Sequence, residues 1–188
     1  MSASEADAHA RLVALLRQRS VQRGSFTLAS GRTSSYYIDA RVTTMSAAGF
    51  LLVGELGLRA IRRARWEAEL VGGLTLGADP VAYAIARASH DAPPILDAFV
   101  VRKEAKGHGA GRRIEGCFHR GARVVVVEDV ITSGQSALAA VEAVREAGGS
   151  VSGVLAVVDR DEGGRAAIER VRVPLISLVS PRDLGVEG

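Results

Sequence analysis

The chain has 188 residues, 47% of them hydrophobic, and carries a net charge of +3 from 24 Lys and Arg against 21 Asp and Glu. This length and apolar content exclude a disordered chain and favour one compact domain over residues 1–188. No apolar run approaches the roughly 20 residues of a membrane span, and Glu5 and Asp7 make the N-terminus unlike an export signal. Cys117 is the only cysteine, which excludes an intrachain disulfide and a cysteine-based zinc site. We therefore expect a cytoplasmic protein with no membrane partner.

The basic residues do not predict a nucleic-acid partner. Aromatic side chains that could stack on bases make up only 4% of the chain. The arginine-rich segment Arg59–Arg65 has helical spacing, which is typical of a solvated helix face. A mild positive charge also suits small anionic substrates.

The first quarter of the chain predicts a helix and then a small hood over residues 20–45. Apolar residues recur at helical spacing, so an amphipathic helix should end near Ser20. Two β-prone runs, Phe26–Leu28 and Tyr36–Asp39, flank Ser30 and Gly31 and predict a hairpin. Ser46 can cap the next helix, which begins a core over about residues 46–180.

Strands and helices alternate through this core. The expected strands are Leu70–Val71, Ile95–Val101, Val124–Val127, Val151–Val158 and Leu175–Val179. The expected helices are one capped by Asp79 and ending near Arg87, then Ser136–Ala147 and Arg165–Arg170, with a long loop over Arg102–Gly116. This alternation predicts an α/β fold, with a mainly parallel sheet covered by helices on both faces. Ligands bind beyond the carboxyl ends of such strands, so three polar turns should meet there, Gly72–Gly77, Glu128–Ser136 and Asp159–Gly164.

One of these turns carries the most chemical information. Four buried valines precede Glu128 and Asp129, and the hydroxyl- and glycine-rich turn Thr132–Ser136 then opens a helix. Free N–H groups and the dipole at a helix N-terminus bind a phosphate well, and the two carboxylates can accept hydrogen bonds from neighbouring sugar hydroxyls. The order of residues fits neither a Walker loop nor a dinucleotide-binding turn. The competing interpretation is a solvated strand end followed by ordinary helix capping.

Taken together and in this order, these residues resemble the phosphoribosyl-diphosphate (PRPP) signature of the type I phosphoribosyltransferases. Further segments resemble the orotate phosphoribosyltransferases in particular. Phe26–Asp39 is similar to their N-terminal segment, Val101–Gly109 to their mobile catalytic loop, and Val158–Arg160 to the strand end that holds the orotate carboxylate. The resemblance extends from about Leu12 to Leu178, and it implies the type I fold with a small N-terminal hood.

The resemblance implies transfer of the phosphoribosyl group from PRPP to orotate, giving orotidine 5′-monophosphate and pyrophosphate in pyrimidine nucleotide synthesis. It implies catalytic roles for Lys103, Lys106, His108 and Asp129. It assigns PRPP to Thr75, Arg102, Lys103, Lys106, His108, Glu128, Asp129, Val130, Ile131, Thr132, Ser133, Gly134, Gln135 and Ser136. It assigns orotate to Tyr37, Thr132 and Arg160. For the loop cations the competing interpretation is a solvated charge run, and for Arg160 it is a salt bridge with Asp159 or Asp161.

The resemblance also implies a metal and a second subunit. Mg²⁺ is the expected cofactor, held mainly by substrate oxygens and water, so no dedicated protein ligand is expected. The expected assembly is a homodimer in which the loop 102–113 completes the site of the neighbouring subunit.

The sequence also shows two departures from the family and leaves two alternatives open. Many members of the family have lysine where this chain has Ala29 and Leu76. One alternative is a purine-base phosphoribosyltransferase, although the segment around Tyr37 and the cation Arg160 favour orotate. The other is a PRPP-sensing regulator that binds nucleic acid through Arg59–Arg65, although we expect no room for a DNA-binding domain before Phe26.

Overall fold

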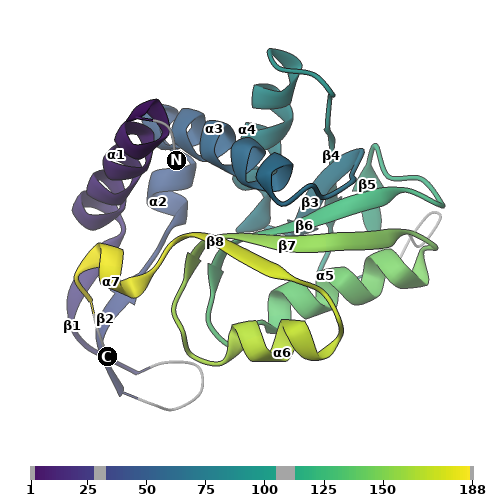
Figure 1. The fold of residues 1–188 in the computed structure, drawn as a ribbon. Helices are drawn as coiled ribbons and strands as arrows, with labels where there is room; N and C mark the ends of the chain where they lie inside the picture. The colour runs from purple at the N-terminus through teal and green to yellow at the C-terminus, as the bar shows by residue number, and fades with distance from the viewer. Residues whose placement is uncertain (1–2, 28–32, 105–112, 187–188) are drawn as a thin grey trace.

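A six-stranded sheet forms the centre of the protein, which a computed structural model describes over residues 3–27, 33–104 and 113–186 (Figure 1). The strand order is β5-β4-β3-β6-β7-β8, and every neighbouring pair is parallel except β4 with β5. The strands are β3 (Leu70–Leu74), β4 (Asp97–Val101), β5 (Ile114–Gly116), β6 (Arg123–Ile131), β7 (Ser150–Asp159) and β8 (Leu175–Val179). The predicted mainly parallel sheet is therefore confirmed.

Helices cover both faces of this sheet because its central strands are apolar on both faces. In β6, Val125 and Val127 pack into one hydrophobic core, while Val124 and Val126 pack into the other. The first core lies under α3 (Ala47–Arg63) and α4 (Ala78–His90). The second lies under α5 (Gln135–Glu146) and α6 (Gly164–Arg170) on the opposite side (Figure 1). Ser46 caps α3 as predicted, since its hydroxyl accepts the Gly49 N–H.

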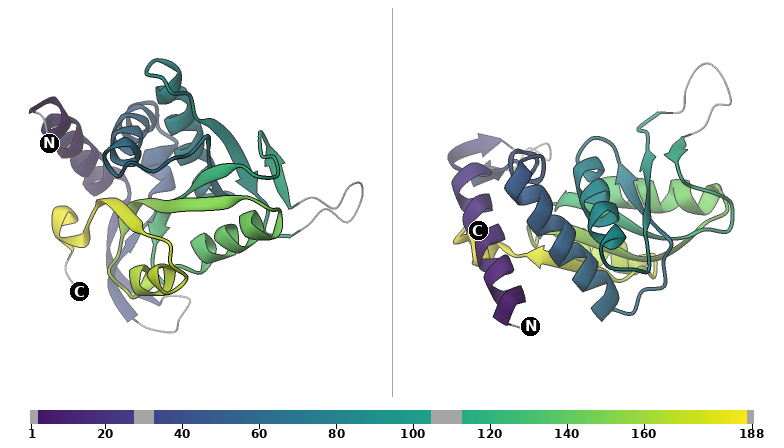
Figure 2. Two further views of the ribbon diagram at one scale, coloured as in Figure 1. Left: turned by 45° about the vertical axis from the view of Figure 1, so that its right-hand side comes forward. Right: turned by 90° about the horizontal axis from the view of Figure 1, so that it is seen from above.

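The N-terminal part forms the predicted helix and hood. The helix α1 (Ala3–Arg19) is followed by the antiparallel strands β1 (Val21–Thr27) and β2 (Thr33–Ile38) and by the short helix α2 (Arg41–Thr44). A buried hydrogen bond of 2.7 Å joins the hydroxyls of Ser20 and Thr43 and fastens the hood to α2. The hood lies beside α1 and α7 (Pro181–Leu184), on the side of the molecule away from β4 and β5 (Figure 2). The expected hairpin tip at residues 28–32, with Ala29, lies outside the described residues.

Several predicted boundaries are wrong. β3 continues to Leu74, so Gly72 and Gly73 belong to the strand and not to the predicted polar turn. A Cβ on either glycine would lie 2.2 Å from a carbonyl oxygen of a neighbouring strand, so these glycines allow tight strand packing. α4 begins at Ala78 with Gly77 at the N-cap position, which places Asp79 inside the first turn.

The segment Arg102–Gly116 is not all loop. Ile114–Gly116 forms β5 and pairs with β4, and Ile114 lies directly opposite Val101. Ile114 is buried, so tertiary contacts stabilise a strand that the polar local sequence does not indicate. No helix in the described ranges is long and apolar enough to cross a membrane.

Candidate active site

The candidate site is a cavity of about 610 Å³ at the carboxyl ends of β3, β6 and β7. The sheet changes its winding direction between β3 and β6, and open α/β sheets bind ligands at such a point. The three polar segments predicted to meet do contribute to one cavity, together with the hood. The lining residues are Tyr37, Ile38, Asp39, Arg41, Leu74, Thr75, Leu76, Gly77, Lys103, Glu128, Asp129, Val130, Thr132, Ser133, Gln135, Ser136 and Arg160.

Glu128 and Asp129 line the floor of this cavity in two different environments. Both belong to the last part of β6 and not to the turn after it, because the strand extends to Ile131. Glu128 is only 6% exposed, and its Oε2 has no hydrogen-bond partner within the described structure. Burial, and then the neighbouring negative charge of Asp129, raise the pKa of Glu128 to about 9. At neutral pH the raised pKa favours the protonated form of Glu128.

Asp129 lies against the loop that follows β3. Its Oδ1 accepts the N–H of Val130 at 2.8 Å. A Cβ built on Gly77 would lie 2.5 Å from the same oxygen, so only glycine allows this approach of carboxylate and backbone. The carboxylate thus faces the gap between β3 and β6.

The turn from β6 into α5 has the geometry of an anion site. Gly134 is the N-cap residue of α5 with φ of +81°, a left-handed conformation that favours glycine, and no side chain caps the helix. The first N–H groups of α5 are therefore available to a ligand. Thr132, Ser133, Gln135 and Ser136 line the cavity around them. Ile131 was also predicted to bind PRPP, but its side chain is buried in the core under α5 and α6 and does not line the cavity.

The hydrogen-bond donors of Thr75 are less available to a ligand than the sequence suggests. Its hydroxyl donates to Asp79 at 2.7 Å, and its N–H donates to the carbonyl of Val101 at 2.8 Å. Both donors are therefore engaged in holding the loop after β3. Leu76, the next residue, lines the cavity and is exposed.

Arg160 occupies the other side of the cavity, directly after β7. Its side chain is 4% exposed, and its Nη2 lies 2.8 Å from Glu162. The expected alternative partners, Asp159 and Asp161, are not used, since Asp159 pairs with Arg165 at 3.0 Å. Nε of Arg160 has no hydrogen-bond partner within the described residues. An arginine with an unpaired buried N–H is suited to receive a carboxylate.

The hood contributes aromatic rings to the same side. Tyr37 lines the cavity with 38% of its surface exposed, and its ring centre lies 5.8 Å from that of Phe26. Tyr36 points the other way and is buried, as expected for alternate residues of a strand.

The structure describes only the base of the segment predicted to be the catalytic loop. Lys103 lines the cavity, whereas Arg102 pairs with Glu115 at 2.7 Å and is not among the lining residues. Lys106 and His108 lie outside the described residues.

Asp39 and Arg41 line the cavity although the sequence predicted no role for them. They lie where the chain leaves β2 and enters α2, a helix of only four residues. Such a helix is too short to produce a periodic apolar pattern, so its position was not predictable. The one available signal was an acid and a base two residues apart, shortly after the aromatic pair Tyr36 and Tyr37.

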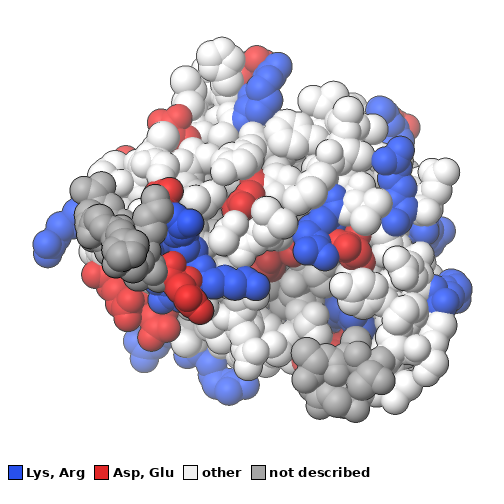
Figure 3. Space-filling model, turned by 180° about the vertical axis from the view of Figure 1, so that it is seen from behind, with Lys and Arg blue, Asp and Glu red and all other residues white. Residues whose placement is uncertain are grey.

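Charges of both signs lie close together on the face shown in Figure 3. Lys and Arg are scattered among Asp and Glu, and uncharged residues cover a broad area above them. This face gives no support to the nucleic-acid alternative, because such binding requires basic residues concentrated together.

Comparison with known proteins finds close relatives over nearly the whole chain. The chain is 48% identical to an orotate phosphoribosyltransferase of Aquifex aeolicus over 178 residues, which are 93% of this chain and 96% of the relative. It is 49% identical over 181 residues to a protein of the same name from Corynebacterium glutamicum, covering 96% of each. A crystal structure of Mycobacterium tuberculosis orotate phosphoribosyltransferase in complex with PRPP has a TM-score of 0.78 and 41% identity, covering 95% of this chain and 92% of that one. Comparison with protein-family profiles finds no match.

Proposed function

The chain belongs to the orotate phosphoribosyltransferase family, and we propose that its reaction takes place in the cavity between β3, β6, β7 and the hood. The predicted type I fold is confirmed, as is the predicted activity. The enzyme transfers the phosphoribosyl group from PRPP to orotate and releases pyrophosphate, a step of pyrimidine nucleotide synthesis. We assign the sugar phosphate, the diphosphate and orotate to three separate parts of this cavity.

We propose that the sugar phosphate lies along the end of β6. The free N–H groups at the start of α5 bind the 5′-phosphate, aided by the hydroxyls of Thr132 and Ser136. Glu128 and Asp129 then bind the ribose hydroxyls. The observation that carries this assignment is the acidic pair near the end of β6, the strand that leads into an uncapped helix N-terminus at the switch point of the sheet.

The diphosphate extends toward the loop after β3. Asp129 faces this loop at Gly77, and Lys103 lines the cavity nearby. Since the donors of Thr75 are engaged, we assign no hydroxyl contact to it, and the leaving group depends on backbone N–H groups and cations. The lysine stabilises the negative charge that develops as pyrophosphate departs.

Orotate lies on the β7 side. We propose that Arg160 binds its carboxylate with the unpaired Nε edge, that Tyr37 packs on the pyrimidine, and that Thr132 contacts the base. This arrangement aligns the nucleophilic ring nitrogen with the anomeric carbon, and such positioning is a large part of catalysis when two substrates must meet.

The protonation state of Glu128 favours an anionic substrate. With its pKa raised to about 9, Glu128 adds no negative charge to the floor of the cavity at neutral pH. A polyanionic donor therefore meets less repulsion on the floor of the cavity. Neutral Glu128 can both donate to and accept from a sugar hydroxyl.

Mg²⁺ is the proposed cofactor, and the described residues fit a metal held mainly by substrate. No group of three His, Cys, Asp or Glu in the described part of the chain could form a metal cage. Asp129 offers one partly exposed carboxylate on the side assigned to the diphosphate. When bound, the cation would neutralise phosphate charge.

We further propose one phosphoribosyltransferase domain, with the hood at about 20–45 and the core at about 46–180, that works as a cytoplasmic homodimer. Exposed apolar side chains on α2, at its C-cap and on α3 and α4 support a subunit contact, namely Val42, Met45, Leu51 and Tyr83. The loop 102–113 would then complete the neighbouring site with Lys106 and His108.

The direct test is an orotate assay with purified protein, PRPP and Mg²⁺. We expect orotate absorbance to fall while pyrophosphate is released in equal amount. The variant Asp129→Asn should lose most of this activity, whereas Glu146→Gln, at the exposed end of α5, should not. Turnover of hypoxanthine or guanine without turnover of orotate would contradict the assignment in favour of a purine base.

A further inference from the structure

Arg41 lines the cavity, and the proposed reaction assigns no role to its positive charge. We propose that Arg41 binds the diphosphate of PRPP and is therefore a further substrate-binding residue of this enzyme. The inference rests on the proposed placement of PRPP along β6.

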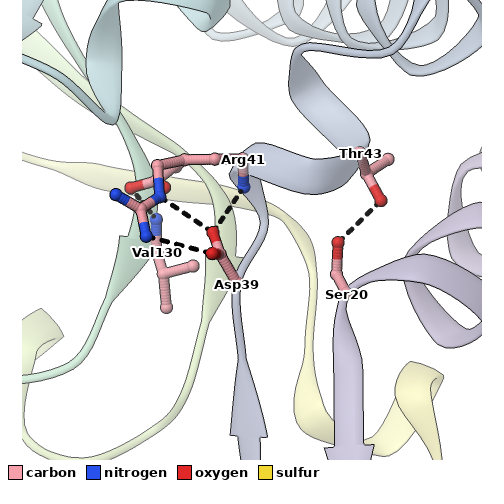
Figure 4. A network of polar contacts seen from close by, with 6 residues as sticks. Ser20, Asp39, Arg41, Thr43 and Val130 are labelled. Carbon is pink, nitrogen blue, oxygen red and sulfur yellow. Dashed lines mark hydrogen bonds and ion pairs between the residues drawn. The ribbon is translucent and has the colours of Figure 1, made fainter.

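Arg41 is held in a fixed orientation by Asp39 (Figure 4). Its Nε donates to Asp39 Oδ1 at 2.8 Å and its Nη2 donates to Oδ2 at 3.0 Å, while its backbone N–H donates to Oδ1 at 3.2 Å. These hydrogen bonds lower the pKa of Asp39 and raise that of Arg41. Arginine has five N–H donors, so the two-point pair leaves the outer edge of the guanidinium for a ligand. A cation ordered in advance loses less entropy when the substrate arrives.

The position of Arg41 favours the diphosphate over the pyrimidine. After its partner Asp39, Asp129 and then, more weakly, Tyr37 raise the pKa of Arg41, so the guanidinium lies within electrostatic reach of both. Asp129 in turn lies against Gly77 in the loop after β3. Arg41 therefore belongs to the side of the cavity where the diphosphate is assigned, and Arg160 serves the β7 side.

The small number of cations that line the cavity also favours this role for Arg41. The Lys and Arg side chains among the described residues of the lining are Arg41, Lys103 and Arg160. Arg160 is assigned to the orotate carboxylate on the β7 side. Leu76, which faces the diphosphate side, brings no charge. A polyanion at this end thus has Arg41 as its fixed cation, and Lys103 from the base of the loop.

The test measures binding and kinetics of three arginine variants. Arg41→Gln removes the charge, and Arg41→Lys keeps the charge without the planar fork. Arg123→Gln is the matched control, because Arg123 also forms a pair with an acid, at 2.6 Å from Glu67, but lies at the opposite end of β6. Calorimetry gives the affinity for pyrophosphate with Mg²⁺, steady-state assays give both KM values, and thermal melting checks that each variant folds.

We expect Arg41→Gln to weaken pyrophosphate binding and to raise the KM for PRPP by about tenfold or more, the loss typical of a hydrogen bond to a charged group. The KM for orotate should change less than about twofold. Arg41→Lys should lie between wild type and Arg41→Gln, and Arg123→Gln should match wild type. Unchanged pyrophosphate affinity in folded Arg41→Gln would overturn the inference, as would a rise confined to the KM for orotate. Inactivity of the wild type toward orotate would instead refute the proposed function itself.

Discussion

The guanidinium carbon of Arg160 lies 4.7 Å from the centre of the Tyr36 ring. This contact joins the end of β7 to the hood, which are far apart in the sequence, and it holds the arginine from one side. Glu162 holds it from another through an ion pair of 2.8 Å. The cation assigned to the orotate carboxylate therefore owes its orientation to two residues that do not line the cavity.

Replacing Tyr36 by leucine should weaken orotate binding. A buried cation–π contact contributes about 1–2 kcal/mol, so we expect the KM for orotate to rise about 5- to 30-fold while the KM for PRPP stays within about twofold. Tyr36→Phe keeps the ring and should behave like wild type. Steady-state kinetics with each substrate varied in turn gives the answer, and equal rises in both KM values would exclude this positioning role.

The buried Glu128 predicts a specific dependence of stability on pH. The folded state holds the Glu128 proton up to a pKa of about 9, whereas the unfolded chain releases it near the ordinary value of 4.5. Between these values the folded state binds more protons, so this residue lowers the free energy of unfolding by up to about 1.4 kcal/mol per pH unit as pH rises.

In Glu128→Gln this contribution is absent, so the variant should gain stability relative to wild type from pH 6 to pH 9. Urea unfolding at constant ionic strength across that range measures the difference. Glu146→Gln, on the surface of α5, is the control and should follow wild type. Parallel profiles for wild type and Glu128→Gln would show that Glu128 is ionised in the folded protein.

Alanine substitutions at two glycines with similar positive φ can distinguish an effect on stability from an effect on phosphate binding. Gly134 and Gly121 have φ of +81° and +86°, so alanine at either should cost roughly 1 kcal/mol of stability. A Cβ at 134 would also lie 3.0 Å from the Gly164 carbonyl, whereas a Cβ at 121 meets nothing within 4 Å.

We therefore expect Gly134→Ala to raise the KM for PRPP about tenfold, because the turn that presents the α5 N–H groups must shift. Gly121→Ala should lower the melting temperature alone. If both variants retained the wild-type KM for PRPP, the start of α5 would not be the phosphate site.

Lys103→Ala should lower kcat about a hundredfold and weaken PRPP binding far less, since the charge acts mainly as pyrophosphate leaves. Rapid-quench assays and calorimetry on the same preparation separate the two effects. An equal loss in rate and in binding would contradict a role confined to the transition state.

Mixing Lys106→Ala and Asp129→Asn subunits tests the shared site. If the loop completes the neighbouring cavity with Lys106, mixed dimers contain one site with both residues intact and should regain part of the wild-type rate. Mixed dimers demonstrated by mass spectrometry but without recovered activity would show that each chain uses its own Lys106.

The sequence alone determined the order of elements and the chemistry of the central turn. Four consecutive valines are buried on both faces of a parallel sheet, and the acids, hydroxyls and glycine that follow them have local consequences. They predict that a helix begins with its first N–H groups free, although the strand itself continues through both acids to Ile131. Local patterns of this kind depend on neighbours in the chain, so they can be inferred without the fold.

Only the tertiary structure decided which distant residues share the cavity and in what state. Strand β5 exists because Ile114 is buried opposite Val101, although its own segment is polar. Arg41 reaches the site because the hood brings the start of α2 to the cavity, and Glu162 rather than an adjacent aspartate pairs with Arg160. Burial of Glu128 beside Asp129 sets its charge. These properties depend on packing and desolvation between segments far apart in the chain, which local sequence patterns do not encode.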